Sequence, residues 1–395
     1  MRKPLFLAAL LALSLLWGCA APAPIPDDPG SCTLTFLTIG KGDCFLLTTP
    51  AQTHYLIDTG KAEDYPQIAR TLREKDIHHL EGIFLTHGHK DHAGCLEPLL
   101  TAFPTQTVFL SAWDTVSYTE IDPRTIAPAH QTALTELRGD EVLDLEGVQA
   151  QVWLPPVVDE KNANNNSLVL RLTHGKNTFL LMGDAELEEE ALLLSSSMDL
   201  SARVLKLGHH GETDATSPAL LDRVRPDMAL IPGNAEENPD SVNETIRTRL
   251  DQRGIQPFYS TGEPLDLISD GSTLRTERMA RRDLPQTLHL SLTEVDRKRE
   301  CVTIQNDSPE PARLDGCLLL SGRGHEMFFF PPDTVLEGGA QLRIVTESSD
   351  EDGDLLWPEN SVWKKKGDPA LLYDQNMNLL AADGAEPSVP ARSLT

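Results

Sequence analysis

The segment Thr86-His87-Gly88-His89-Lys90-Asp91-His92 constrains the fold more than any other part of the sequence. It follows Gly82-Ile83-Phe84-Leu85, a short apolar run that is typical of a buried strand. Imidazole and carboxylate together suit Zn²⁺ or Mn²⁺ better than Ca²⁺ or Mg²⁺. Alternate positions can place His87 and His89 on one ion, while Asp91 and His92 turn toward a second ion. A metal-free, His-rich surface loop is the alternative, but four ligand groups directly after a strand argue against it.

The first residues are typical of a bacterial secretion signal. Residues 1–19 begin with Arg2 and Lys3 and continue with an apolar stretch that is too short for a confident membrane span. The segment ends at Cys19, which resembles a lipoprotein site, and residues 20–30 form a Pro-rich tether. We therefore expect a lipid anchor on Cys19 at the outer face of the bacterial cytoplasmic membrane. Plain secretion is the alternative, because Trp17 is bulkier than the small residue usual there.

The net charge argues against one class of partner. The 395 residues include 34 Lys and Arg against 60 Asp and Glu, a formal charge of −26. Such an acidic surface repels polyanions at long range and disfavours a broad, nonspecific nucleic-acid footprint. It does not exclude a polyanion that metal ions hold locally.

The order of strand and helix signals predicts two domains. Over residues 31–275 paired strands alternate with helices, which suggests two sheets with helices outside. Residues 276–286 form a charged linker, and residues 287–384 carry short, regularly spaced strand signals typical of a small β-sandwich. Residues 385–395 are expected to be a disordered tail. Disulfides Cys32–Cys44 and Cys301–Cys317 or buried free thiols are equally compatible with the cysteine positions.

Two later apolar strands also end in groups that could bind metal. Residues 179–183 lead into Asp184, and residues 204–207 lead to His209 and His210. A two-metal site needs a bridging carboxylate and one more imidazole from such strand ends. Asp184 and the His pair are the candidates.

These motifs resemble the metallo-β-lactamase superfamily, and more closely the hydrolase domain of the competence protein ComEC. The wider resemblance rests on residues 36–43, 56–60, 164–170, 182–186, 206–211 and 268–271, and covers about 31–275. It implies a four-layer αββα fold and two divalent metal ions, with Zn²⁺ expected and Mn²⁺ the alternative. The implied ligands of the first metal are His87 and His89, and those of the second metal are Asp91, His92 and His209. Asp184 would lie between the two ions, and Asp58 would orient the metal loop. His210 would touch the substrate, unless it exchanges roles with His209.

Two departures from the family pattern concern the metal site and the substrate. Many superfamily members have a further first-metal His between the first loop and the bridging Asp. Only His130 and His174 lie in that interval, and neither is in a matching motif. An Asn of the 164–166 run, with Asn166 as the candidate, or water would fill the position. The family's Gly-His-Pro is replaced by Glu-Asn-Pro at 237–239, so a substrate-contacting His is missing.

Residues 287–384 resemble a lamin-tail domain, an immunoglobulin-like sandwich. The resemblance rests on residues 300–306, 314–320, 328–331, 336–342, 362–363 and 367–374, with Cys317 where the family often has Trp. It implies a domain that binds a protein partner or a surface and is not catalytic.

These observations predict a membrane-tethered, two-metal hydrolase of a phosphodiester, with extracellular DNA as the candidate substrate. Asp91 is the carboxylate expected to orient the attacking hydroxide, and Thr213, Thr216 and Ser217 could bind phosphate at a helix N-terminus. Helix capping by Thr216 is the alternative there. The competing hypotheses are a hydrolase of another small substrate, such as a phosphorylcholine ester or a lactam, and a surface adhesin with a non-catalytic core.

Overall fold

Two large mixed sheets form the centre of the protein. The computed structural model describes residues 30–118, 121–233, 240–364 and 367–384. The first sheet has the order β15-β14-β1-β2-β3-β4-β5-β6. Its strands are β1 Cys32–Phe36, β2 Phe45–Thr48, β3 His54–Ile57, β4 Leu80–Phe84, β5 Thr105–Ser111, β6 Ala133–Leu137, β14 Leu265–Ser269 and β15 Leu274–Arg278.

The second sheet packs face to face with the first. Its order is β13-β12-β11-β10-β9-β8-β7. Apolar side chains of both sheets, such as Phe36, Phe45 and Phe179, share one buried cluster, which fills the space between the layers. The strands of the second sheet are β7 Val142–Asp144, β8 Gln149–Trp153, β9 Val169–His174, β10 Asn177–Leu181, β11 Val204–Lys206, β12 Met228–Ile231 and β13 Gln256–Tyr259.

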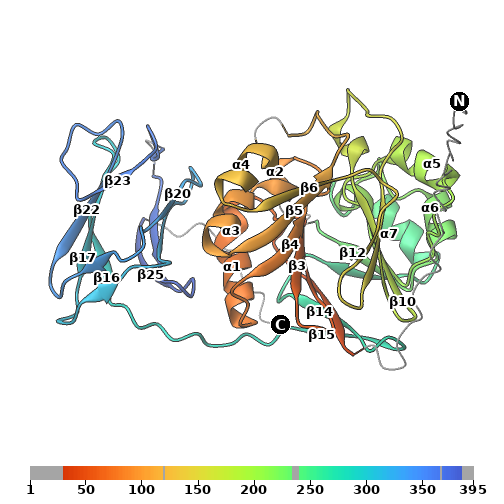
Figure 1. Cartoon of the computed structure of the whole chain (residues 1–395), viewed down its shortest axis with the longest axis horizontal. Coiled ribbons are helices and arrows are strands. Elements are labelled where there is room, and N and C mark those ends of the chain that lie inside the picture. The colour runs from red at the N-terminus through yellow and green to blue at the C-terminus, as the bar shows by residue number, and fades with distance from the viewer. Residues whose placement is uncertain (1–29, 119–120, 234–239, 365–366, 385–395) are drawn as a thin grey trace, which may run out of the picture.

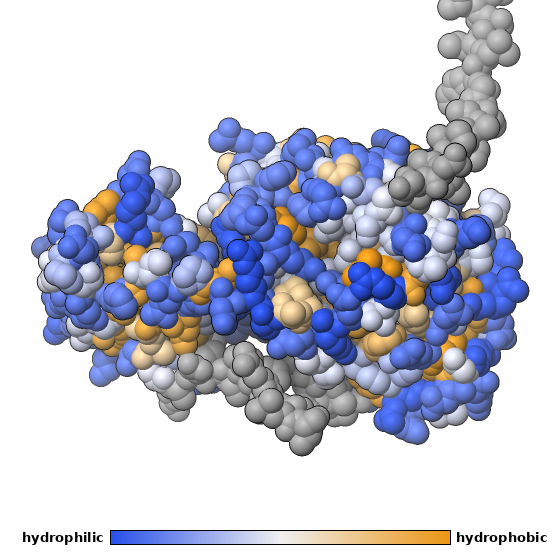
Figure 2. Space-filling model, turned by 90° about the horizontal axis from the view of Figure 1, so that it is seen from below, coloured by the Kyte–Doolittle hydropathy of each residue, from blue (hydrophilic) through white to orange (hydrophobic). Residues whose placement is uncertain are grey.

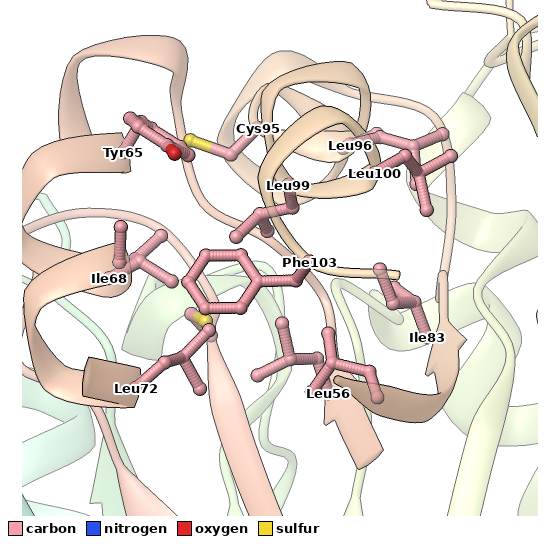
Figure 3. Close-up of a cluster of buried hydrophobic side chains, with 14 of the residues drawn as sticks. Leu56, Tyr65, Ile68, Leu72, Ile83, Cys95, Leu96, Leu99, Leu100 and Phe103 are labelled. Atoms are coloured by element: carbon pink, nitrogen blue, oxygen red, sulfur yellow. The ribbon is translucent and has the colours of Figure 1, made fainter. Parts of the chain in front are cut away.

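Helices cover the outer face of each sheet and complete four layers (Figure 1). Leu72 of α1, Leu99 of α3 and Phe103, just after α3, are buried against the first sheet (Figure 3). Helices α5, α6 and α7 bury Leu193, Leu221 and Leu250 against the second sheet. The helices are η1 Ala62–Asp64, α1 Tyr65–Glu74, α2 Lys90–Ala93, α3 Leu96–Ala102, α4 Pro123–Ala129, η2 Ala163–Asn166, α5 Leu187–Ser195, η3 Gly208–Gly211, α6 Pro218–Val224 and α7 Glu244–Asp251.

The C-terminal region is built from strands alone in its described part. Two four-stranded sheets, β16-β17-β22-β23 and β20-β19-β24-β25, pack across one apolar cluster, and β18 pairs with β21 at the side. The strands are β16 Leu290–Asp296, β17 Cys301–Asn306, β18 Ala312–Arg313, β19 Leu318–Ser321, β20 Met327–Phe329, β21 Val335–Leu336, β22 Gln341–Thr346, β23 Leu355–Trp357, β24 Ala370–Tyr373 and β25 Leu379–Asp383.

This region packs against helices α1 and α3, on the side of the core away from the second sheet (Figure 1). Leu318 and Leu371 belong to the same buried cluster as Leu72 of α1. The rings of Tyr65 and Phe329 meet edge to face, with centroids 5.5 Å apart. Apolar contacts of this kind fix the C-terminal region against the first sheet's helices.

The layered α/β core with a β-rich C-terminal region confirms the expected fold class. The five described cysteines, Cys32, Cys44, Cys95, Cys301 and Cys317, are buried free thiols, so neither disulfide forms. In the described part of the chain, every helix is too short or too polar to cross a membrane. The expected signal segment, Cys19 and nearly all of the tether lie outside the described residues.

Candidate metal centre

Strand ends from both sheets meet at the candidate metal centre. Strands β3 and β4 pair in parallel, as do β10 and β11, so their carboxyl ends point the same way within each sheet. The segment after β4 is joined to the second sheet where Leu168 N–H donates to the Thr86 carbonyl at 2.8 Å. Side chains that follow these strands are thereby brought to one place between the sheets.

Four buried side chains form what we term the central cluster: Asp43, His92, Asp184 and His210. One ligand atom of each lies within 4.8 Å of those of the other three. Asp184 Oδ2 lies between two imidazoles, 3.0 Å from His92 Nε2 and 3.1 Å from His210 Nε2. Asp91, with a side chain 23% exposed, approaches from the open side, with Oδ2 at 3.3 Å from His210 Nε2.

Unused polar atoms in this cluster fit a divalent cation. His92 Nε2, both ring nitrogens of His210 and Asp43 Oδ1 are buried and make no well-oriented hydrogen bond to any described residue. His87 Nε2 is also buried and without a hydrogen-bond partner among the described residues, and the centroids of the His87 and His92 rings are 4.1 Å apart. Buried polar atoms without partners are costly, and imidazole nitrogens beside carboxylate oxygens are ligands of Zn²⁺ and Mn²⁺. The residues present therefore fit the metal ions that the sequence predicts.

The charges of the side chains in the metal-free protein also indicate a site for a cation. Burial opposes ionisation of Asp184, but His210, His92 and Lys206 outweigh it and hold the Asp184 pKa well below its ordinary value. Burial lowers the pKa of His210, yet Asp184, Asp43 and Asp91 raise it further, to about 10. Protonated imidazoles thus supply the positive charge that the carboxylates require when no metal ion does so.

Asp58 fixes the orientation of the metal loop from behind. Its Oδ1 accepts the Thr86 N–H at 2.7 Å, and its Oδ2 accepts the Thr86 hydroxyl at 2.7 Å and lies 2.8 Å from His92 Nδ1. The opposite ring nitrogen of His92 is left facing Asp184. Metal-binding histidines commonly use a carboxylate in this way to fix the tautomer and the ring orientation.

His87 and His89 lie beside the central cluster but are not members of it. The His87 ring is buried, and its centroid is 4.6 Å from that of His89. The loop between them is held where the Gly88 N–H donates to Ser117 Oγ at 2.7 Å. A Cβ at Gly88 would meet Tyr118 Cδ1 at 2.4 Å, so only glycine fits there.

The two adjacent histidines turn in different directions. His209 and His210 both have left-handed backbone angles, with φ of 41° and 53°, in η3. This turn directs His210 into the central cluster. His209 instead lies with Nδ1 at 3.0 Å from Asp214 Oδ1 and 3.7 Å from Glu186 Oε1. The exchange of roles that the sequence left open is therefore the arrangement observed: His210, not His209, stands beside Asp184.

Asp43 and Lys206 are two site residues that the sequence interpretation missed. Lys206 is fully buried, with Nζ at 2.5 Å from Asp43 Oδ2 and 3.4 Å from Asp184 Oδ1. Nζ also donates to the Gly183 carbonyl at 2.5 Å. A lysine inside the apolar strand β11 was the available signal, because buried lysines are rare unless paired. Asp43 lies in the loop between β1 and β2, within the segment 36–43 that carries the family resemblance.

Several other candidate residues have different uses in the structure. The Asn166 amide bonds the backbone of Asp159: its Oδ1 accepts the Asp159 N–H at 2.8 Å, and its Nδ2 donates to the Asp159 carbonyl at 3.0 Å. His130 lies 3.7 Å from Glu97, and His174 lies 2.7 Å from Ser269 Oγ, so neither supplies the missing ligand. Residues 237–239 lie outside the described residues.

A protein carboxylate occupies the start of α6, where Thr213, Thr216 and Ser217 were expected to bind phosphate. The backbone N–H groups of Thr216 and Ser217 already donate to the carboxylate of Glu190, which occupies the helix N-terminus. Ser217, rather than Thr216, is the N-cap, since its Oγ accepts the Leu220 N–H at 3.1 Å. Thr213 is exposed and is not part of this arrangement.

Comparisons with known proteins place this geometry in a family. The Metallo-beta-lactamase superfamily profile matches residues 37–233. ComE operon protein 3 of Bacillus subtilis is 26% identical over 237 residues, which are 56% of this chain and 30% of that protein. Recombination protein 2 of Haemophilus influenzae is 34% identical over 152 residues, 38% of this chain and 17% of that protein.

The chain thus spans less than a third of the length of these curated relatives. Among solved structures, the metallo-beta-lactamase fold protein YhfI from Bacillus subtilis is similar, with 14% identity and a TM-score of 0.43 over 61% of this chain and 100% of that one. With the profile match and the layered core, residues 37–233 form a domain of the metallo-beta-lactamase superfamily, distantly related to ComE operon protein 3, with a buried His and Asp cluster suited to metal ions.

Proposed function

We propose that this protein is a metal-dependent hydrolase of phosphodiesters, with extracellular DNA as its candidate substrate. The central cluster carries the proposal, because it gathers the buried carboxylates and unpaired imidazole nitrogens that a metallohydrolase needs. The name of one relative, Recombination protein 2 of Haemophilus influenzae, supports a nucleic-acid substrate.

Two ions are expected, with Zn²⁺ favoured and Mn²⁺ the alternative. Bound ions of this kind supply hydroxide from water near neutral pH and offset the charge on phosphoryl oxygens. The residues proposed to hold them are His87, His89, Asp91, His92, Asp184 and His210, with Asp43 beside them.

Asp91 is the group best placed to handle the attacking water. Its side chain reaches the open side of the cluster, whereas Asp184 is buried. Although burial raises its pKa, His210 and His92 lower it well below the ordinary value, so Asp91 is a charged acceptor at neutral pH. It can therefore accept a hydrogen bond from a water molecule and orient it.

A substrate panel tests this function. The purified protein, loaded with Zn²⁺ or Mn²⁺, should hydrolyse bis-(p-nitrophenyl) phosphate and DNA, and Asp184→Asn or His210→Ala should abolish both activities. Arg275→Gln, a change of an exposed residue at the edge of the first sheet, is the control. Hydrolysis that persists in both variants would overturn the proposed site.

The acidic surface favours one alternative substrate class. A formal charge of −26 opposes the approach of long polyanions, which would favour a small ester or lactam. Nitrocefin and p-nitrophenyl phosphorylcholine belong in the same panel for this reason. Turnover of either one without cleavage of DNA would replace the nuclease assignment. A metal content below one ion per chain, together with no turnover of any substrate, would favour the alternative of a surface adhesin with a non-catalytic core.

The remaining proposals concern location and the C-terminal region. We propose that Cys19 carries a lipid anchor that holds the protein at the outer face of the cytoplasmic membrane. We also propose that residues 287–384 form a lamin-tail domain that binds a partner or a surface. Cys19→Ser should move the protein from the membrane fraction to the soluble fraction. An unchanged distribution would contradict the anchor.

A further inference from the structure

The loop between β1 and β2 places Lys41 beside the central cluster. In this loop the Asp43 N–H donates to the Asp91 carbonyl at 3.0 Å, and the Gly42 N–H donates to the carbonyl of Pro232, just after β12, at 3.4 Å. A Cβ at Gly42 would lie 3.0 Å from the Asp91 carbonyl oxygen, so a larger residue would crowd the metal loop. The loop is therefore held against both sheets, with Lys41 next to a member of the central cluster.

Lys41 brings a positive charge that solvent can reach to the metal centre. Its side chain is 21% exposed, whereas Lys206, which contacts Asp184, is fully buried and cannot touch a substrate. Burial lowers the pKa of the Lys41 ammonium, but the carboxylates of Glu212, Asp91 and Asp184 raise it above its ordinary value. Lys41 is therefore charged at neutral pH and close to the carboxylates that surround the expected metal ions.

Glu212 contacts the Lys41 ammonium from the segment that follows η3. Lys41 Nζ lies 3.0 Å from Glu212 Oε1, and the Glu212 side chain is 17% exposed. An ion pair that water reaches contributes little to stability, because solvent and salt screen it. Another anion can therefore replace the Glu212 carboxylate at little cost. The non-bridging oxygens of a phosphodiester share a negative charge, and an ammonium group donates charge-assisted hydrogen bonds to such oxygens.

We propose that Lys41 binds a phosphoryl oxygen of the substrate and that Glu212 competes with the substrate for the same ammonium group. The inference rests on the proposed function and deepens it, since it assigns recognition of the substrate's negative charge to a residue outside the set of metal ligands. A neutral ester gains nothing from this contact. Lys41 therefore favours phosphodiesters over neutral esters.

The two members of the pair should have opposite effects on anion binding. Lys41→Gln removes the ammonium group that donates to the phosphoryl oxygens, whereas Glu212→Gln removes the competitor of those oxygens. A pair that served only to hold the two loops together would give losses in both variants. The sign of the Glu212→Gln effect therefore separates substrate binding from a structural role.

Titration calorimetry with inorganic phosphate measures these effects without turnover. The full chain is loaded with Zn²⁺, freed of excess metal and titrated at neutral pH. Lys41→Gln should weaken phosphate binding about tenfold or more, because hydrogen bonds from a charged donor are lost. Glu212→Gln should strengthen it about threefold, as expected for loss of a partly exposed ion pair. Lys41→Arg keeps the charge and should bind phosphate more tightly than Lys41→Gln.

Lys75→Gln is the matched control. Lys75 has the same side-chain exposure as Lys41, 21%, and pairs with Asp266 at the same distance, 3.0 Å. It follows α1 and precedes β4, so it lies at the opposite end of β4 from the metal loop. Phosphate affinity should be unchanged in this variant, and circular dichroism checks that every variant is folded. Glu212→Gln keeps the test decisive if Lys41→Gln does not fold.

Unchanged phosphate affinity in a folded Lys41→Gln protein would overturn the proposal, as would weaker binding by Glu212→Gln. Equal losses in Lys41→Gln and Lys75→Gln, or no phosphate binding by the unmodified protein loaded with Zn²⁺, would also overturn it. Opposite shifts in the two variants without hydrolysis of bis-(p-nitrophenyl) phosphate or DNA would support Lys41 as the anion-binding residue. Only the proposed hydrolase activity would then fail.

Discussion

Lys206 shows how one buried charge is tolerated at the metal centre. Its ammonium group contacts Asp43, Asp184 and the Gly183 carbonyl, and none of its side chain reaches solvent. Burial lowers its pKa, but the two carboxylates raise it further, so it remains charged. It therefore offsets part of the carboxylate charge even without metal ions.

Replacing this lysine should destabilise the metal-free protein. Lys206→Met leaves the Asp43 and Asp184 carboxylates buried without their cation, a change that costs about 3–5 kcal/mol. Bound metal should restore part of the loss, and urea unfolding with and without Zn²⁺ measures both effects. Lys75→Met is the matched control, since Lys75 pairs with Asp266 at 3.0 Å at a more exposed position and should cost about 1 kcal/mol or less. Equal losses in the two variants would contradict this account of Lys206.

Metal binding should release protons from the histidines. The His210 pKa is raised to about 10, so in the metal-free protein its imidazole stays protonated below that pH. A metal ion must displace that proton, and apparent affinity should therefore rise between pH 7 and 10, roughly tenfold per pH unit for each proton. Calorimetry in buffers of different ionisation enthalpy measures the release, and His210→Ala should release fewer protons. A binding heat that does not change between buffers would be inconsistent with this.

At the scale of elements, the start of α6 is a structural cap. Ser217→Ala removes the side-chain acceptor of the Leu220 N–H and should cost about 0.5–2 kcal/mol of stability. Because Glu190 occupies the neighbouring N–H groups, the KM for a phosphodiester should stay unchanged. Thr213→Ala, at an exposed position, should change neither quantity. A raised KM with normal stability would instead return this helix end to the substrate site.

The strand signals predicted much of the core because they depend on local patterns. The apolar runs before Asp184 and His209 are strands β10 and β11, and the run before His87 is β4. Their parallel pairing explains why motifs far apart in sequence meet. Short or half-polar elements, such as β7 and α4, show no clear periodicity in the sequence.

Side-chain direction within the site could not be predicted in the same way. Which of His209 and His210 faces Asp184 depends on two left-handed backbone angles in η3, and no local pattern predicts these for histidine. The hydrogen bonds between the Asn166 amide and the loop at Asp159 could not be predicted either. Both outcomes depend on contacts between segments that are distant in the sequence.

At the scale of the whole molecule, the C-terminal region and the core share an apolar contact. Figure 2 shows hydrophilic residues with scattered apolar ones on the visible face of both parts, whereas the side chains that join the two parts are buried apolar ones. Tyr65 and Phe329 lie at this contact, where Arg70 Nη1 also reaches Asn378 Oδ1 at 3.5 Å.

The two parts should therefore unfold together. We expect a single calorimetric transition for the unmodified protein and a split or broadened one for Phe329→Ala, which removes about 2 kcal/mol of burial from the contact. Leu356→Ala, a change of a side chain 56% exposed in the same region, should leave the single transition intact. Two separate transitions in the unmodified protein would show that the contact does not couple them.

The metal centre draws on segments from residue 43 to residue 210, in both sheets. Neither sheet alone supplies the set, and the hydrogen bond between Leu168 and Thr86 forms only when the sheets meet. Contacts of such large sequence separation form late and slowly during folding, because long loops must close first. During refolding, metal binding should therefore be among the last native properties to return. Its recovery would show that both sheets have formed and packed together.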